Sequence, residues 1–225
     1  MNNLISILEK QTDVKVIAPE IDYADYIPFD LSATTTDKIR LPLTDSKAFE
    51  AFVENYFSET QTKVAFGGYL EHRNLYQRST VFKDLNIEER NIHIGLDLWI
   101  KAGTPVLAAL DGIIHSFQNN NTLGDYGPTI ILEHTIEGET FHTLYGHLSL
   151  ESLNKKTEGQ KVTKGEIIAT LGAPPINGDY APHLHFQIIK DMQEKKGDYP
   201  GVCAKSKLNF YKENCPDPNL LLKIN

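Results

Sequence analysis

The sequence is poor in cysteine, with 2 in 225 residues, and it holds 1 tryptophan and 2 methionines. Two thiols cannot build a disulfide-dense scaffold or a zinc site made of four thiolates. Cys203 and Cys215 both lie in the last tenth of the chain. The sequence is compatible with a single bridge between them and equally with two free thiols.

The chain also lacks an excess of positive charge and a long apolar run. Its 22 Lys and Arg residues stand against 30 Asp and Glu, a formal net charge of −8. Because an acidic surface repels phosphate backbones and anionic lipids, we expect no nucleic-acid partner. No apolar run reaches the roughly 18–20 residues that cross a bilayer, which predicts no membrane span. The opening ten residues lack the basic start and apolar stretch of a secretory signal, which predicts a cytoplasmic location.

Hydrophobic residues make up 40% of the chain and charged residues 23%, as in an ordinary globular protein. Residues 1–60 are predicted to be a helical and irregular N-terminal region. In its second half, apolar residues recur at three- and four-residue spacing, which is typical of an amphipathic helix packed on something else: Phe49, Phe52, Val53, Tyr56 and Phe57. Residues 22–38, rich in Asp, Thr, Tyr and Pro, favour an extended connection.

Residues 61–195 are predicted to form the main domain, and from about residue 92 short β-type runs alternate with glycine-containing turns. The pattern predicts strands over residues 105–109, 113–118, 129–136, 140–148, 167–171 and 183–189. Many short strands without long helices between them indicate a mainly β fold of antiparallel sheets, a sandwich or a barrel. Residues 196–225 are predicted to be a tail, with a short helix and an extended strap, that packs on this domain.

Two short motifs carry residue types that bind metal ions. In His93-Ile-Gly-Leu-Asp97, a histidine nitrogen and a carboxylate oxygen are both zinc donors, and Gly95 between them allows the bend that would bring them together. In His183-Leu-His185, residues two apart on a strand point to one face, with Cα atoms about 6.5 Å apart. The alternative for the second motif is a hydrogen-bonded pair on the outer face of a strand.

A third motif, Leu144-Tyr-Gly-His147-Leu-Ser149, places a histidine beside Gly146, where another backbone or a substrate can approach closely. The three motifs together supply the three N/O ligands and the neighbouring proton-transfer groups of a hydrolytic zinc site. The remaining histidines are predicted to be structural: His72, His115, His134 and His142.

In order and context these motifs resemble the LytM/lysostaphin-type zinc metallopeptidases, which cut peptide cross-links of the bacterial cell wall. The resemblance also covers residues 103–112 after the first motif and residues 159–172, and it spans roughly residues 92 to 190. It implies an antiparallel β-sheet with a groove over it and one Zn²⁺ per chain. His93, Asp97 and His185 would hold the zinc, while His147 and His183 would transfer protons and stabilise the oxyanion. The implied substrate is a peptide or peptidoglycan.

The stretch before His93 departs from the usual pattern of these relatives, with Arg73 and Arg78 where they have a shorter opening. A guanidinium can hold a substrate carboxylate through two hydrogen bonds, so both arginines are candidate substrate-binding residues, with a salt bridge as the alternative.

Three other functions stay open at the level of the sequence. The first is a catalytically silent metal- or groove-binding regulatory module of the same fold. The second is a phosphocarrier domain with paired histidines, against which Asp97 argues because phosphate transfer needs no zinc-binding carboxylate. The third is a biotinyl- or lipoyl-carrier function of the segment at residues 162–166. The segment lacks the apical lysine motif with flanking methionines that such carriers have.

Overall fold

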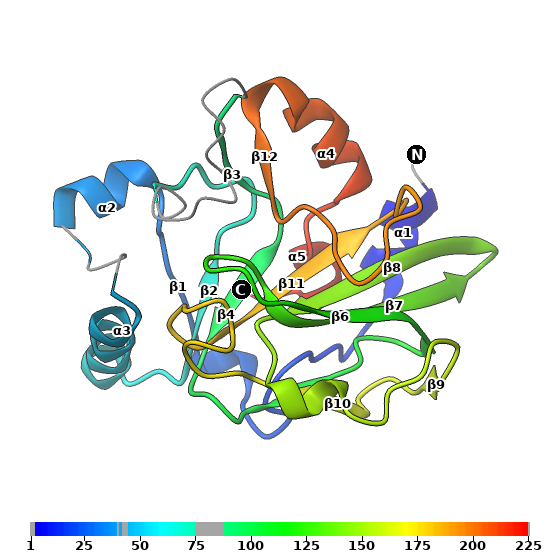
Figure 1. Cartoon of the computed structure of the whole chain (residues 1–225), viewed down its shortest axis with the longest axis horizontal. Helices are drawn as coiled ribbons and strands as arrows, with labels where there is room; N and C mark the ends of the chain where they lie inside the picture. The colour runs from blue at the N-terminus through cyan, green and yellow to red at the C-terminus, as the bar shows by residue number, and fades with distance from the viewer. Residues whose placement is uncertain (1–2, 40, 42–44, 75–87, 225) are drawn as a thin grey trace.

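The computed structural model describes residues 3–39, 41, 45–74 and 88–224. Its centre is an eight-stranded sheet in the order β1-β2-β4-β11-β8-β7-β6-β9 (Figure 1). The strands of this sheet are β1 (Tyr26–Pro28), β2 (Val64–Gly67), β4 (Leu96–Trp99), β6 (Gly112–Asn120), β7 (Gly127–Ile136), β8 (Glu139–Gly146), β9 (Lys161–Val162) and β11 (His183–Ile189). Two further pairs are β5 (Pro105–Leu107) with β10 (Ile167–Thr170), and β3 (Arg90–His93) with β12 (Val202–Ala204).

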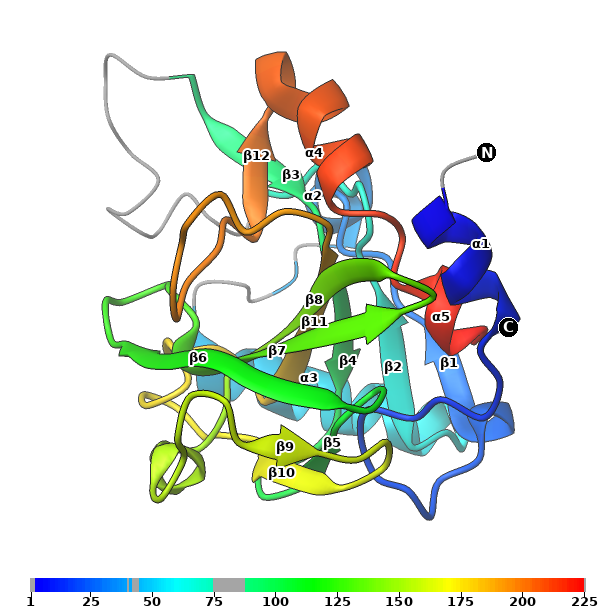
Figure 2. The same ribbon diagram turned by 90° about the vertical axis from the view of Figure 1, so that its right-hand side faces the viewer.

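The prediction of a mainly β, antiparallel fold with N-terminal helices is confirmed. Among the strands of the described residues, β1 and β2 form the one parallel pair, and the other pairings are antiparallel. The helical elements are α1 (Asn3–Lys10), η1 (Tyr23–Asp25), α2 (Ala33–Ile39), α3 (Ser46–Thr60), η3 (Leu150–Leu153), η4 (Lys205–Lys207), α4 (Leu208–Asn214) and α5 (Asn219–Leu222). Figure 1 shows α2 and α3 beyond the β1 edge, and Figure 2 shows α1 beside α5 near both chain ends.

Strand β11 lies in the middle of the sheet and is buried along its whole length. Its alternate residues face opposite sides, as the pleat requires. Leu184, Phe186 and Ile188 belong to the main hydrophobic core, which also takes in α1 and α5. His185 and Gln187 therefore project from the other face, together with Ile189, which packs in a second apolar cluster under β12 and α4. This second face carries the polar residues described below.

Helix α3 confirms the amphipathic pattern predicted around residues 49–57. The carboxylate of Asp45 caps its first turn by accepting from the backbone N–H groups of Lys47 and Ala48. Its buried residues Phe49 and Val53 pack with Phe29 in a cluster that includes Trp99 of β4. The N-terminal region thus packs directly against a strand of the main sheet.

The extended connection predicted over residues 22–38 is wrong in part, because α2 lies inside it. A run of three threonines, Thr34 to Thr36, lowers intrinsic helix propensity and led the sequence pattern away from a helix. Ser32 starts the helix nonetheless, since its hydroxyl accepts from Thr35 N–H and its carbonyl accepts from Thr36 N–H. Earlier in the same segment, β1 adds an edge strand to the sheet.

The tail from residue 202 onward packs on the sheet through β12, α4 and α5. Cys203 and Cys215 are both free and buried, so of the two sequence alternatives the structure has two thiols. At the chain ends, the Lys223 ammonium donates to the carbonyl of Glu9 at 2.7 Å, which ties the tail to α1. Among the described residues no helix combines the length and the apolar character needed to cross a membrane.

Candidate functional site

Three metal-binding side chains meet where β3, β4 and β11 come together. His93 is the last residue of β3, and Asp97 and His185 are paired directly across the β4–β11 ladder. Gly95 lies between β3 and β4, where the backbone makes the predicted bend. A Cβ there would lie 2.4 Å from the His185 ring. Only glycine leaves room for that imidazole. The bend and the antiparallel register together bring a local motif and a distant strand to one point.

The donor atoms of this first cluster face one another at the spacing of ligands around one ion. His93 Nε2 lies 2.9 Å from His185 Nδ1 and 3.3 Å from Asp97 Oδ1, and His185 Nδ1 lies 3.1 Å from the same oxygen. Tetrahedral donors at zinc distances of 2.0–2.2 Å are about 3.3 Å apart. All three side chains are buried. The geometry fits a small divalent cation of the zinc type.

Hydrogen bonds on the far side of each imidazole assign the tautomers. His93 Nδ1–H donates to the carbonyl of Gly68 at 2.9 Å, and His185 Nε2–H donates to Gln187 Oε1 at 3.0 Å. The amide of Gln187 is itself oriented, because its Nε2 donates to the carbonyl of Pro200. Both histidines are thereby left with a lone pair aimed at the carboxylate of Asp97. Three acceptors that point at one another form a candidate site for a cation between them.

Arg73 supports the carboxylate from behind. Its Nη1 donates to Asp97 Oδ2 at 2.6 Å, its Nε donates to Glu71 Oε2, and its guanidinium lies over the Trp99 ring. Burial alone would raise the pKa of Asp97, but its interactions with His93 and with the Arg73 guanidinium hold that pKa well below its usual range. Burial, with the charge of Arg73, lowers the pKa of His93 to about 4. The cluster therefore offers an ionised carboxylate and a neutral imidazole at pH 7.

Two more histidines lie beside the cluster with a different hydrogen-bond pattern. The rings of His147 and His183 are 4.2 Å apart between centroids, and the His147 ring lies 6.3 Å from that of His185. His147 Nδ1–H donates to the carbonyl of Asn177 and His183 Nδ1–H to that of Ala181, each at 2.7 Å. Each ring keeps Nε2 as its acceptor. Burial is the largest of the effects that lower the pKa of these two imidazoles, so both are neutral at pH 7.

The backbone at His147 is unusual for a histidine. Its φ of 62° lies in the left-handed region, and its backbone N–H donates to the carbonyl of Tyr126. The Tyr126 ring also occupies the space beside Gly146, where a Cβ would come within 2.7 Å of it. The close approach predicted at this glycine is thus made by Tyr126. This packing fixes the direction in which the His147 imidazole leaves the strand end.

All five residues line one open pocket of about 210 Å³. One wall is the loop from Lys195 to Gly201, which includes Asp198, and the other is the segment from Gly124 to Tyr126. Apart from these five residues, its lining carries both signs of charge, with Arg90 and Lys195 as well as Asp125 and Asp198. Within the described part of the chain, the pocket's lining includes no residue before Arg73, so the N-terminal helices leave it open.

The structure brings together the five predicted side chains, His93, Asp97, His147, His183 and His185, in this pocket. Arg73 also lines it, although its described hydrogen bonds go to protein carboxylates, and Arg78 lies outside the described residues. The sequence analysis missed the residues that orient the donors, Gly68, Glu71, Tyr126 and Gln187. Only Gln187 had a local signal, since it follows His185 by two positions and so faces the same side of β11.

Replacing Arg73 with methionine is expected to lower the free energy of unfolding of the metal-free chain by about 3–5 kcal/mol, because the buried Asp97 and the partly buried Glu71 lose their cation. The Arg73 side chain is 1% exposed. Lys63, 60% exposed and paired with Asp25, is the control, and its change to methionine should cost about 0–1 kcal/mol. Urea denaturation of both variants measures the difference. Equal, small losses would show that the buried pairs contribute nothing to stability.

Comparison with known proteins agrees with this geometry. Residues 91–197 match the sequence profile of peptidase family M23, a segment that contains all five side chains and is just under half of the chain. This part of the chain is therefore an M23 metallopeptidase domain. Arg73 and the other residues before position 91 lie outside the matched segment.

The relatives are bacterial. A Haemophilus influenzae protein described as an uncharacterized metalloprotease is 39% identical over 95 residues, which is 42% of this chain and 18% of that protein. The peptidoglycan DD-endopeptidase ShyC of Vibrio cholerae is 34% identical over 98 residues, 43% of this chain and 20% of ShyC. The chain thus matches about a fifth of the length of these curated relatives. Among solved structures, the catalytic domain of lysostaphin from Staphylococcus simulans covers 54% of this chain and 80% of its own, with 28% identity and a TM-score of 0.38.

Proposed function

We propose that this protein is a zinc-dependent endopeptidase that hydrolyses peptide bonds of peptidoglycan or of related peptides. The observation that carries the proposal is the first cluster: two histidines whose tautomers are fixed so that their lone pairs meet an ionised Asp97. A bound zinc ion supplies Lewis acidity, which polarises a peptide carbonyl and lowers the pKa of a water molecule. Peptidoglycan is proposed as the substrate because ShyC, a relative over this segment, is named for that activity.

His147 and His183 supply the proton chemistry in this proposal. A neutral imidazole with a free Nε2 can accept the proton of the attacking water, which needs a base with its lone pair available at neutral pH. The protonated ring then donates Nε2–H to the leaving amine or to the oxyanion. Since both Nδ1–H groups are held by backbone carbonyls, the rings cannot turn away from the pocket while they transfer the proton.

Arg73 takes a different part in the proposal from the one the sequence indicated. Both of its described hydrogen bonds go to carboxylates of the protein, and its guanidinium stacks over Trp99. We infer that it positions Asp97. The binding of a substrate carboxylate by Arg73 stays a prediction, and Arg90 and Lys195 are two further cations that line the pocket.

The test is the digestion of cross-linked muropeptides by the full chain, followed by mass spectrometry. We expect the zinc-loaded protein to release peptides that have gained one water, chelation to stop the reaction, and added Zn²⁺ to restore it. A zinc-loaded protein that leaves a broad panel of muropeptides and cross-linked peptides intact would contradict the proposal. That result would instead favour a silent module that only binds the groove's ligand.

A further inference from the structure

A second group of metal-binding side chains lies on the same face of the sheet, away from the first. His115 of β6, Glu133 of β7 and His142 of β8 come from three neighbouring strands. One donor atom of each lies within 4.8 Å of the others. We call these three residues the second cluster. Its donor set, two histidines and one carboxylate, is the same as that of the first cluster.

Strand register explains how the second cluster forms. Glu133 and His142 are direct partners in the β7–β8 ladder, so their side chains share a face. His115 joins them through a bulge, because Ile114 pairs with Leu132 and Ser116 pairs with Ile131, which leaves His115 as the extra residue. Bulges of this kind re-aim a side chain. The histidine thereby reaches the position where two other donors already meet.

The spacing within the second cluster resembles that of two ligands on one metal ion more than that of a hydrogen-bonded pair. Glu133 Oε2 lies 3.5 Å from His142 Nε2, beyond an ordinary hydrogen bond but close to the spacing of about 3.3 Å between donors on one tetrahedral zinc ion. The rings of His115 and His142 meet edge to face with centroids 4.8 Å apart. Glu133 is 33% exposed and His115 is partly exposed, so small side-chain rotations can close the remaining gap.

Ser116 provides the supporting hydrogen bond that a ligating histidine needs. Its Oγ lies 2.8 Å from His115 Nδ1 and accepts from the backbone N–H of Gly197. A hydroxyl oxygen has two lone pairs, so Ser116 can accept from both groups when His115 binds a metal through Nε2. Gly197 belongs to the loop that forms one wall of the catalytic pocket. Its amide is therefore a local reporter of occupancy.

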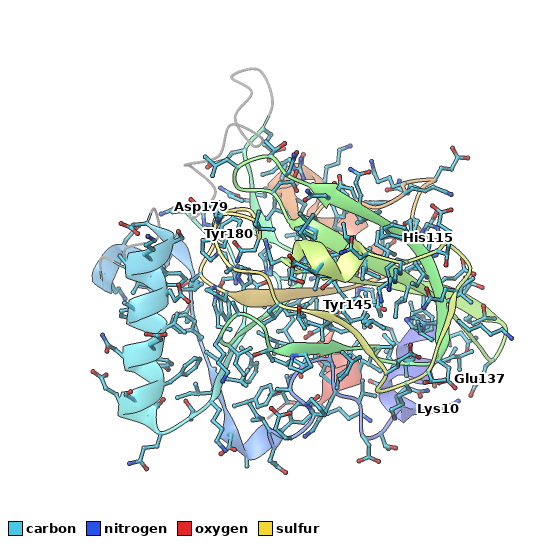
Figure 3. The ribbon with its side chains drawn as sticks, turned by 60° about the horizontal axis from the view of Figure 1, so that its bottom comes forward. Lys10, His115, Glu137, Tyr145, Asp179 and Tyr180 are labelled. Carbon is cyan, nitrogen blue, oxygen red and sulfur yellow. The ribbon has the colours of Figure 1, made fainter. Side chains whose placement is uncertain are left out.

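The second cluster is separate from the first. On β8, His142 stands four residues from Gly146, the partner of His185, a distance of about 13 Å along a strand. Figure 3 shows His115 far from Tyr180, whose ring packs against His147 and His183. One ion therefore cannot serve both groups.

From this geometry we propose that His115, Glu133 and His142 form a second, solvent-accessible site for a divalent cation of the zinc class. The donor chemistry selects zinc over magnesium or calcium, since those ions take oxygen ligands. The second site binds more weakly than the first, because Glu133 and His142 lie 3.5 Å apart, against 2.9–3.3 Å between donors of the first cluster, and because two of its residues are partly exposed. It goes beyond the proposed peptidase activity and does not depend on it.

The experiment is a calorimetric titration of the metal-free full chain with Zn²⁺. We expect two binding phases in the wild type, and the weaker phase should shift the NMR signal of the Gly197 amide. Glu133→Gln and His115→Ala should each weaken that phase by about tenfold or more, since even supporting residues of a metal ligand contribute that much. Both positions are partly exposed, so the variants are expected to fold.

Two controls separate this site from the first cluster and from simple charge effects. His93→Ala should keep the weaker phase and lose the tight one. Glu158→Gln removes an exposed acidic group that pairs with Lys196, near His115, but removes no donor, so both phases should remain. A single phase in the wild type, or a weak phase that persists unchanged in both Glu133→Gln and His115→Ala, would overturn the proposal. Neither outcome would touch the proposed peptidase function.

Discussion

Replacing His93 with alanine is expected to remove the tightly bound zinc and, with it, all measurable peptidase activity. The physical reason is the donor count. His93 contributes one of three ligands, so its loss leaves two, His185 and Asp97. A catalytic zinc site has three protein ligands. Zinc content is measured by atomic emission after dialysis against a weak chelator, and activity by muropeptide digestion.

His72→Ala is the matched control, because His72 is an exposed histidine near the same strand, bridged to Ile92 through its backbone. This variant should keep its tight zinc and its activity. Full zinc content in His93→Ala would show that the first cluster is not the tight site. Loss of zinc with undiminished digestion would separate the metal from the reaction and contradict the proposed mechanism.

Replacing His147 or His183 is expected to lower kcat by about 10²–10⁴-fold while the tight zinc stays bound, the range of a lost general acid or base. His147→Asn is the better change at the first position, since asparagine tolerates the left-handed backbone with φ of 62°. At the second position His183→Gln keeps a polar side chain beside Trp99, on which the imidazole stacks. KM should change little, because the transferred proton matters in the transition state more than in binding.

The readout that separates proton transfer from a structural role is the pairing of zinc content with kcat. A purely structural residue would lower both, through unfolding or through loss of the metal. Retained zinc with an unchanged kcat in both variants would exclude His147 and His183 from the reaction. His134→Asn is a buried control outside the pocket, where both ring nitrogens are already bonded, to the Asp111 carbonyl and to Thr143. It should lower stability without a selective loss of kcat.

Local patterns predicted much of the fold because strands and helices bury one face at a fixed period. The run from His183 to Ile189 is a strand with the predicted bounds, and the aromatic stripe around Phe49 is a helix. The pattern failed in two places. Three threonines concealed α2, and the parallel pairing of β1 with β2 has no signature in a three-residue strand.

The histidines also show which features local patterns predict and which depend on long-range strand pairing. His134 was predicted to be structural, and its two hydrogen bonds agree with that interpretation. His115 and His142 received the same prediction, yet the structure places them beside Glu133. No spacing in the sequence joins residues 115, 133 and 142. They meet because of the β7–β8 register and one bulge in β6, and a register shift of a single residue would turn them to opposite faces.

The sequence by itself determined the type of chemistry, since ligand identity depends on residue type and on short motifs: His93 with Asp97, and His183 with His185. Only the tertiary structure decided which lone pair each imidazole presents. Gly68, Gln187 and Pro200 fix the tautomers and Arg73 holds the carboxylate, through contacts between residues that are up to 25 positions apart in the sequence. A proton's position on a ring is set by whichever acceptor folding brings to its other side, and that partner is distant in sequence for His93.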